Sequence, residues 1–192
     1  LLGVVAMALL SGARDLAQIH RFSWRLLPAH RAALGFRRHP GKKSFRMPGY
    51  SVYRDVLIAL DLDAFARVLS AWLAARRGSL PAALALDGKM IRDTIGVLSL
   101  VDAETGVPAM LRVITQKEGD GQHCEKCVGR EAVADLPDAQ GALISGDALH
   151  TDKTMAELAV DNGADYLLQV KDNQPGLKAR LARKTAGSPF LL

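Results

Sequence analysis

Hydrophobic and polar positions follow two different patterns along the chain, and the change falls near residue 78. Before it, apolar residues recur at helical spacing over residues 1–19 and again over residues 62–75, which predicts two helices. From residue 82 onward, short apolar runs bounded by Gly, Pro or Asp predict strands, and they alternate with amphipathic helical stretches. The pattern therefore predicts a helical N-terminal region, residues 1–78, followed by an α/β domain, residues 79–192.

The second region has the element order of a mixed sheet with helical crossovers. Its second and third predicted strands flank a segment that contains Gly106 and Pro108, and we expect these two strands to form a hairpin. Gly163 is expected to end the second helix of this region. The predicted strands are 83–87, 98–103, 109–114, 142–147 and 165–170, and the predicted helices are 125–136, 152–162 and a helix after Pro175.

Charge is distributed unevenly between the two regions. Through Gly78 there are 13 Lys and Arg against 4 Asp and Glu, a balance of +9, whereas the remainder carries 12 against 16, a balance of −4. A basic first part is typical of a surface that meets a polyanion, and an acidic second part is typical of a region that gathers carboxylates.

The first thirteen residues resemble the apolar core of a signal peptide, but they lack an initiating Met and a basic start. They are also too short to span a bilayer, so we expect a buried helix, and we expect no membrane partner. The missing Met indicates that the chain starts inside a longer reading frame. Two cysteines, Cys124 and Cys127, exclude a disulfide framework and fit the cytoplasm. This lone C-x-x-C pair is too small for structural zinc, and a redox role would require a helix start after a strand.

Two aspartates, Asp87 and Asp147, each end an apolar run that is predicted to be a strand. On neighbouring parallel strands such carboxylates lie in one crevice, where they can hold a divalent metal for phosphoryl chemistry. The alternative is local: Asp87 opens a tight turn with Gly88, and Asp147 precedes a helix whose N-cap is Thr151. His150 is either a helix-start residue or a neighbour of the metal.

Basic side chains suggest contacts with phosphate. The segment from residue 20 to residue 54 holds nine Lys and Arg and no acid, with aromatic residues interleaved that either stack on bases or pack the helices. Cations and amides also follow the predicted strands 83–87 and 165–170, where they either face the crevice or form solvated turns. The expected phosphate contacts are Arg37, Arg38, Lys42, Lys43 and Arg46 in the first group, and Lys89, Arg92, Lys171, Asn173 and Gln174 in the second.

Four short segments resemble, in the same order, the DDE transposases of bacterial insertion sequences, and most of all the H-repeat-associated branch. The resemblance covers residues 1–181 and implies an RNase H-like fold. In that fold Asp87 and Asp147 are the first two acids of a metal-binding triad, which holds Mg²⁺ or Mn²⁺ for DNA cleavage and strand transfer. The segments are Leu86-Asp87-Gly88-Lys89, residues 100–106, residues 146–151, and Asp165-Tyr166 with Lys171-Asp172-Asn173-Gln174.

One part of the family pattern is missing. The third acid of the triad, a Glu, lies on a helix beyond the K-x-N-Q segment in the family, and this chain stops at Leu192 before such a region. The later acids Glu157, Asp161 and Asp172 do not occupy that position. We therefore expect an incomplete RNase H-like domain and a truncated, inactive transposase fragment.

The resemblance also implies the partners of the intact enzyme: element-end DNA, target DNA and a further copy of the enzyme in a homo-oligomer, at the nucleoid of the cytoplasm. Two other functions remain open on the residues alone. One is a DNA-binding remnant without chemistry, and the other is a Mg²⁺-dependent phosphohydrolase of small phosphate esters.

Overall fold

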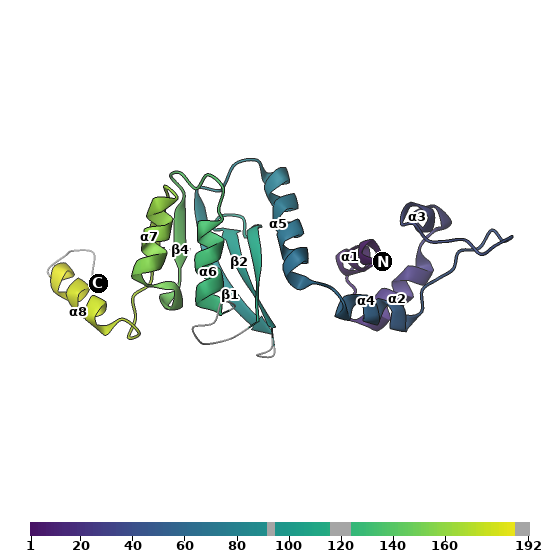
Figure 1. Cartoon of the computed structure of the whole chain (residues 1–192), viewed down its shortest axis with the longest axis horizontal. Helices are drawn as coiled ribbons and strands as arrows, with labels where there is room; N and C mark the ends of the chain where they lie inside the picture. Colours follow the sequence, from purple (N-terminus) through teal and green to yellow (C-terminus); the bar gives the residue numbers. More distant parts are fainter. Residues whose placement is uncertain (92–94, 116–123, 187–192) are drawn as a thin grey trace. The chain divides into compact units, whose positions relative to one another are not determined.

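The computed structural model of the chain describes residues 1–91, 95–115 and 124–186 (Figure 1). It divides into two compact units, Leu1–Asp61 and Leu62–Leu192. The second unit is built on a five-stranded sheet with the strand order β3-β2-β1-β4-β5. In this sheet β1, β2 and β3 are antiparallel neighbours, whereas β4 pairs parallel with β1 and β5 parallel with β4.

The expected mixed α/β class is confirmed, since a mixed sheet with helical crossovers follows a helical N-terminal unit, an arrangement compatible with an RNase H-like fold. The predicted hairpin and crossover helices are also present. Strand β1 continues four residues past its predicted end at Asp87, because it forms the long central partner of β2. The second unit contains α5 (Leu62–Arg77), β1 (Ala83–Ile91), β2 (Ile95–Asp102), β3 (Pro108–Ile114), α6 (Glu125–Ala134), β4 (Leu143–Gly146), a 3-10 helix (Ala148–His150), α7 (Lys153–Asp161), β5 (Asp165–Leu168) and α8 (Pro175–Thr185).

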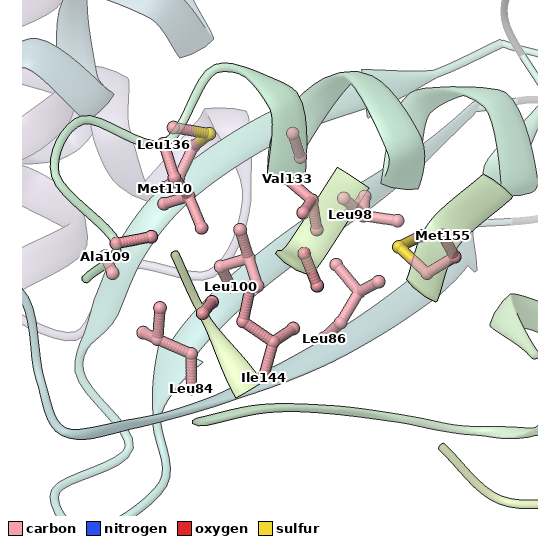
Figure 2. Close-up of a cluster of buried hydrophobic side chains, with 14 of the residues drawn as sticks. Leu84, Leu86, Leu98, Leu100, Ala109, Met110, Val133, Leu136, Ile144 and Met155 are labelled. Atoms are coloured by element: carbon pink, nitrogen blue, oxygen red, sulfur yellow. The ribbon is translucent and has the colours of Figure 1, made fainter. Parts of the chain in front are cut away.

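One face of the sheet carries the hydrophobic core of this unit (Figure 2). Strand side chains alternate between faces, so Leu84 and Leu86 of β1 lie on the core side together with Ile144 of β4. Helices α6 and α7 cover that face and contribute Val133 and Met155 to the same cluster. The burial of these apolar side chains fixes which face of each strand is covered, and it therefore places Asp87 on the opposite side from Leu86.

Helix α5 packs against β3, the strand at one edge of the sheet, and forms hydrogen bonds with its backbone. The Ser70 hydroxyl donates to the Leu111 carbonyl oxygen at 3.1 Å and accepts from the Leu111 N–H at 2.9 Å. The Arg77 guanidinium donates to the Ala109 carbonyl oxygen at 3.1 Å. These bonds satisfy backbone groups of the edge strand β3, which would otherwise be open to pairing with another chain. Because of this packing the division between the units falls before α5, one helix earlier than the boundary expected after residue 78.

The N-terminal unit is a small helical cluster around Tyr53, Val4 and Ala8, each at most 1% exposed. The single helix expected over residues 1–19 is two helices, because Gly12 adopts a positive φ of 88° and the Asp15 carboxylate caps a new start. The buried residues of the first helix agree with the expected buried helix. The helices of this unit are α1 (Leu2–Leu10), α2 (Leu16–Arg25), α3 (Pro28–Ala33) and α4 (Tyr50–Ile58).

None of the helices in the described ranges is both long enough and apolar enough to cross a bilayer.

Replacing Ser70 by Ala tests the edge contact. The variant leaves both backbone groups of Leu111 without their partner in a site where Ser70 is only 8% exposed. We expect the free energy of unfolding to fall by about 1–3 kcal/mol, as measured by urea denaturation. The exposed Ser79, replaced by Ala in the same unit, is the control and should stay within about 0.5 kcal/mol of the parent. Equal stability of the two variants would contradict this account of the edge.

Candidate functional site

The parallel pairing of β1 with β4 brings the two predicted aspartates together. Its last paired residues are Leu86 and Gly146. Asp87 and Asp147 occupy the next position on each chain, so they lie side by side where β4 ends. Both residues are exposed. Two carboxylates that are sixty positions apart in the sequence therefore lie at the same end of the β1–β4 pair.

Asp147 also organises the turn that follows β4. Its Oδ1 accepts a hydrogen bond from the Leu149 N–H at 2.9 Å, which caps the short 3-10 helix. The expectation that Thr151 is the N-cap of the next helix is wrong. Asp152 is the N-cap, because its Oδ1 accepts from the Met155 N–H at 2.9 Å. The Thr151 hydroxyl instead lies 2.6 Å from the Gln169 carbonyl oxygen and ties the turn to the end of β5.

The K-x-N-Q segment holds the same turn from the other side. The Asn173 amide donates to the Ala148 carbonyl oxygen at 2.5 Å, and the Gln174 amide donates to the Thr151 carbonyl oxygen at 3.1 Å. These two amides, which the sequence suggested as phosphate contacts, thus bind the backbone that carries Asp147. Lys171 is exposed at the start of this segment.

Lys89 is exposed on β1, two residues beyond Asp87, and strand alternation places it on the same face as that aspartate. Arg92 lies outside the described residues.

Two further polar residues lie next to this place: Glu125, which the sequence did not single out, and His150, which the sequence left as either a helix-start residue or a neighbour of the metal. Glu125 is the first residue of α6, and its carboxylate sits over Gly88 so closely that a Cβ at position 88 would overlap it. His150 is 1% exposed, and its Nε2 is 3.7 Å from the Glu125 Oε1. Gly129, one turn along α6, leaves room for the imidazole, since a Cβ there would lie 2.8 Å from the ring.

Burial and neighbouring carboxylates shift the pKa of both Glu125 and His150. Burial raises the pKa of Glu125, and the carboxylates of Asp147 and Asp87 raise it further. Burial lowers the pKa of His150, although the nearby carboxylates, with Asp147 first among them, oppose that shift. Neither ring nitrogen of His150 has a hydrogen-bond partner within the described residues. The imidazole is therefore a neutral, buried group beside a cluster of negative charge.

Asp152 anchors α6 to α7 next to this cluster. Its Oδ2 lies 2.7 Å from the Arg130 Nη2 and 3.2 Å from the Lys126 Nζ. Burial alone would raise its pKa, but the hydrogen bonds from Met155, Arg130 and Lys126 outweigh burial and lower it. Asp152 is therefore an ionised structural residue whose charge is balanced by two cations.

The donor set at the strand ends fits Mg²⁺ or Mn²⁺, because both aspartates offer hard oxygen ligands. As the side chains stand, no group of three or more His, Cys, Asp or Glu in the described ranges is close enough together to hold a metal ion. Magnesium in phosphate-processing sites is commonly bound by one or two carboxylates plus water and substrate phosphates. Asp87 and Asp147 are the residues of this chain that would hold such an ion.

The predicted basic residues of the N-terminal unit form one structural feature, which we call the basic loop, residues 37–46. Arg38 and Phe45 form an antiparallel bridge, and the Arg46 N–H donates to the Arg37 carbonyl oxygen at 2.8 Å. The Arg38 guanidinium lies 5.1 Å from the centre of the Phe45 ring. The loop therefore carries five exposed cations within ten residues: Arg37, Arg38, Lys42, Lys43 and Arg46.

The aromatic residues interleaved with these cations divide between core and surface. Tyr53 and Phe45 are buried, which agrees with the packing alternative, whereas Trp24 and Tyr50 are 55% and 46% exposed. The exposed pair is in a position to stack on a base, and the buried pair is not.

The C-x-x-C pair lies at the start of α6. Cys124 is the N-cap, its Sγ accepts from the Cys127 N–H at 3.3 Å, and the two sulfur atoms are 2.9 Å apart. Both thiols are free. Burial and the contact with Cys124 raise the pKa of Cys127, with the hydrogen bond to Cys124 as the largest cause, so this thiol is not activated as a nucleophile.

Comparison with known proteins does not assign a function. No family model matches the chain. It is similar to a protein of Xanthobacter autotrophicus described as an uncharacterized protein in the dhlA 3′ region, with 26% identity over 187 residues. That match covers 92% of this chain and 59% of the relative. Among solved structures it is similar to a chain of a simian T-cell lymphotropic virus intasome in complex with the PP2A regulatory subunit B56 gamma. In that match the identity is 16% and the TM-score 0.33, and the match covers 92% of this chain and 60% of the other.

Replacing Gly129 by Ala tests whether this glycine makes room for His150. A methyl group would lie 2.8 Å from the imidazole, and such overpacking costs about 1–3 kcal/mol. This exceeds the ~1 kcal/mol that Ala contributes as a better helix former than Gly. We expect a lower free energy of unfolding in urea denaturation.

The second variant of a double-mutant cycle supplies the control. With His150 already replaced by Ala, Gly129→Ala should be neutral or stabilising, because the clash is gone while the gain in helix propensity remains. A loss of the same size in both backgrounds would show that the imidazole is not the cause.

Proposed function

We propose that this chain is part of a DNA transposase of the DDE type, which cleaves DNA phosphodiesters and transfers strands with the help of Mg²⁺ or Mn²⁺. The observation that carries the proposal is the position of Asp87 and Asp147, side by side where the parallel pair β1 and β4 ends. Carboxylates at the open end of a parallel pair are well placed to hold a cation against a phosphate. The resemblance of the four sequence segments to DDE transposases supports the same function.

The chemistry requires negative charge to be offset. Attack of a water or a DNA 3′-hydroxyl on phosphorus breaks the bond to the leaving oxygen, and charge builds up on the phosphoryl oxygens during that step. A divalent ion bound between the aspartates would stabilise this charge. The residues of this chain would hold the ion and fix its position, because the turn carrying Asp147 is braced by Asn173 and Gln174. Lys89, on the same face of β1, is in a position to contact a phosphate.

The basic loop supports DNA as the substrate rather than a small phosphate ester. Exposed cations that contact phosphates release counterions from DNA, which gives affinity without sequence preference. A small ester offers a single phosphate and gives no reason for five exposed cations on one loop of the other unit. Element-end DNA, target DNA and a homo-oligomeric assembly belong to this proposal.

Replacing Asp87 or Asp147 by Asn tests the metal site directly. Each change keeps the shape of the side chain and removes one negative charge. We expect Mn²⁺ binding, measured by isothermal titration calorimetry, to weaken at least about tenfold. In a full-length version of the enzyme, nicking of supercoiled plasmid DNA in Mg²⁺ or Mn²⁺ should fall by about a hundredfold or more with either change.

Asp161→Asn, at the exposed end of α7, is the matched control and should behave like the parent. If Asp87→Asn and Asp147→Asn bind Mn²⁺ and nick DNA like Asp161→Asn, the proposed metal site is wrong. A parent chain that binds DNA but shows no Mn²⁺ binding supports the DNA-binding remnant instead.

The DNA partner is tested by the salt dependence of binding. In the variant Lys42→Gln, Lys43→Gln, Arg46→Gln, the slope of log affinity against log salt for duplex DNA should fall by up to about three, measured by fluorescence anisotropy. A control variant removes three exposed cations of α8: Arg180→Gln, Arg183→Gln, Lys184→Gln. An equal loss in both variants would show that net charge, and not the basic loop, sets the affinity.

A further inference from the structure

Two glycines stand in the interiors of regular elements where glycine is costly, Gly88 in β1 and Gly129 in α6. Each makes room for a polar side chain and not for a hydrophobic one. Gly88 accommodates the Glu125 carboxylate, and Gly129 accommodates the His150 ring. The fold therefore gives up local stability at two positions to hold a Glu and a His between α6 and the sheet.

Glu125 and His150 lie near the place where β4 ends and β1 continues. Strand β4 stops at Gly146, opposite Leu86, while β1 continues to Ile91. Beyond that stop β1 has no β4 residue beside it, and the Glu125 carboxylate over Gly88 lies one residue along β1 from Asp87. The mutual effect of their charges agrees with this placement, because Asp147 and Asp87 both raise the pKa of Glu125.

Several other acids after β1 in the sequence form ion pairs with Lys or Arg, whereas Glu125 does not among the described residues. Asp152 pairs with Lys126 and Arg130, Asp172 pairs with Lys178, and Glu157 pairs with Lys153. Within the described residues the ion-pair neighbour of Glu125 is His150, whose pKa is lowered by burial. Among the described residues, no Lys or Arg forms an ion pair with Glu125.

The state of His150 is a second, independent observation that points to a ligand at this place. It is 1% exposed, neither ring nitrogen has a hydrogen-bond partner in the described ranges, and its Nε2 faces the Glu125 carboxylate at 3.7 Å. Leaving a buried polar group unsatisfied costs free energy, so such groups in folded proteins generally serve a site. Here the imidazole lies beside the Glu125 carboxylate, which sits over Gly88.

We infer that Glu125 supplies a third carboxylate to the divalent-cation site of Asp87 and Asp147, in the space that Gly88 leaves for it. The inference rests on the proposed function, since it adds a ligand to that metal site. The three carboxylates repel one another, and a cation between them relieves the repulsion.

Glu125→Gln tests the inference, because it keeps the shape of the side chain and removes its charge. We expect the affinity for Mn²⁺, measured by isothermal titration calorimetry on the full 192-residue chain, to fall at least about tenfold, since changes even to residues outside the ligand shell commonly cost that much. The rise in melting temperature that Mn²⁺ produces should shrink in parallel, each variant being compared with its own metal-free form. Glu131→Gln, an exposed residue of the same helix, is the matched control and should retain the affinity of the parent.

The outcomes separate the two proposals. If Asp87→Asn weakens Mn²⁺ binding and Glu125→Gln binds like Glu131→Gln, the third ligand is wrong and the two-aspartate site stands. If Asp87→Asn and Asp147→Asn leave Mn²⁺ binding unchanged, the metal site itself is wrong. Should circular dichroism show that Glu125→Gln does not fold, Glu125→Asp gives the same test. It keeps the charge, withdraws the carboxylate by one methylene, and should also weaken binding; parent affinity in that variant would overturn the inference.

Discussion

The parallel pairing of β1 with β4 is the constraint on which the rest of the second unit depends. It joins segments sixty residues apart, and its register sets Leu86 opposite Gly146. A slip by one residue would turn Ile144 out of the core and move Asp147 away from Asp87. The hydrophobic core and the candidate site are therefore fixed by the same set of hydrogen bonds, because the strand positions that bury Leu86 and Ile144 also align the two aspartates.

The candidate site gathers several departures from the usual rules of a stable fold. Glycine occurs inside a strand at Gly88 and inside a helix at Gly129, and His150 is buried without hydrogen bonds to its ring in the described residues. Burial and the carboxylates of Asp147 and Asp87 raise the pKa of Glu125. Such departures lower stability, and folded proteins tolerate them mainly at functional or strained sites. Their concentration in one place is an argument for function that does not rely on the resemblance.

The turn that carries Asp147 is held by several hydrogen bonds to its backbone, although the Asp147 side chain itself is exposed. Asn173 and Gln174 bind its backbone, and the Thr151 hydroxyl ties it to β5. Asp152 connects the same region to α6 through Arg130. A site in which the ligands are exposed and their backbone is held from several sides is suited to cation binding, because the carboxylates are positioned before the ion arrives.

Local patterns in the sequence determined the elements of the second unit. Apolar runs marked the strands, and Pro and Gly marked their ends, so the mixed α/β class, the hairpin and the crossover helices could be predicted. A common location for Asp87 and Asp147 was also expected from the sequence, and the β1–β4 register aligns Leu86 and Gly146, the residues directly before them. In the N-terminal unit one helix was expected over residues 1–19 and two are present, since the capping by Asp15 interrupts an otherwise helical pattern.

Only the tertiary structure decided the rest. It showed α5 packing through Ser70 on the edge of β3, an interaction between residues forty-one positions apart that no local pattern contains. It showed that Asn173 and Gln174 hold a turn. It also placed Glu125 beside the aspartates: its position at a helix start looks ordinary in the sequence, and its closeness to Gly88 and His150 arises only when α6 packs across the sheet. Periodicity reports which face of an element is buried, whereas the meeting of polar groups depends on how those faces are joined.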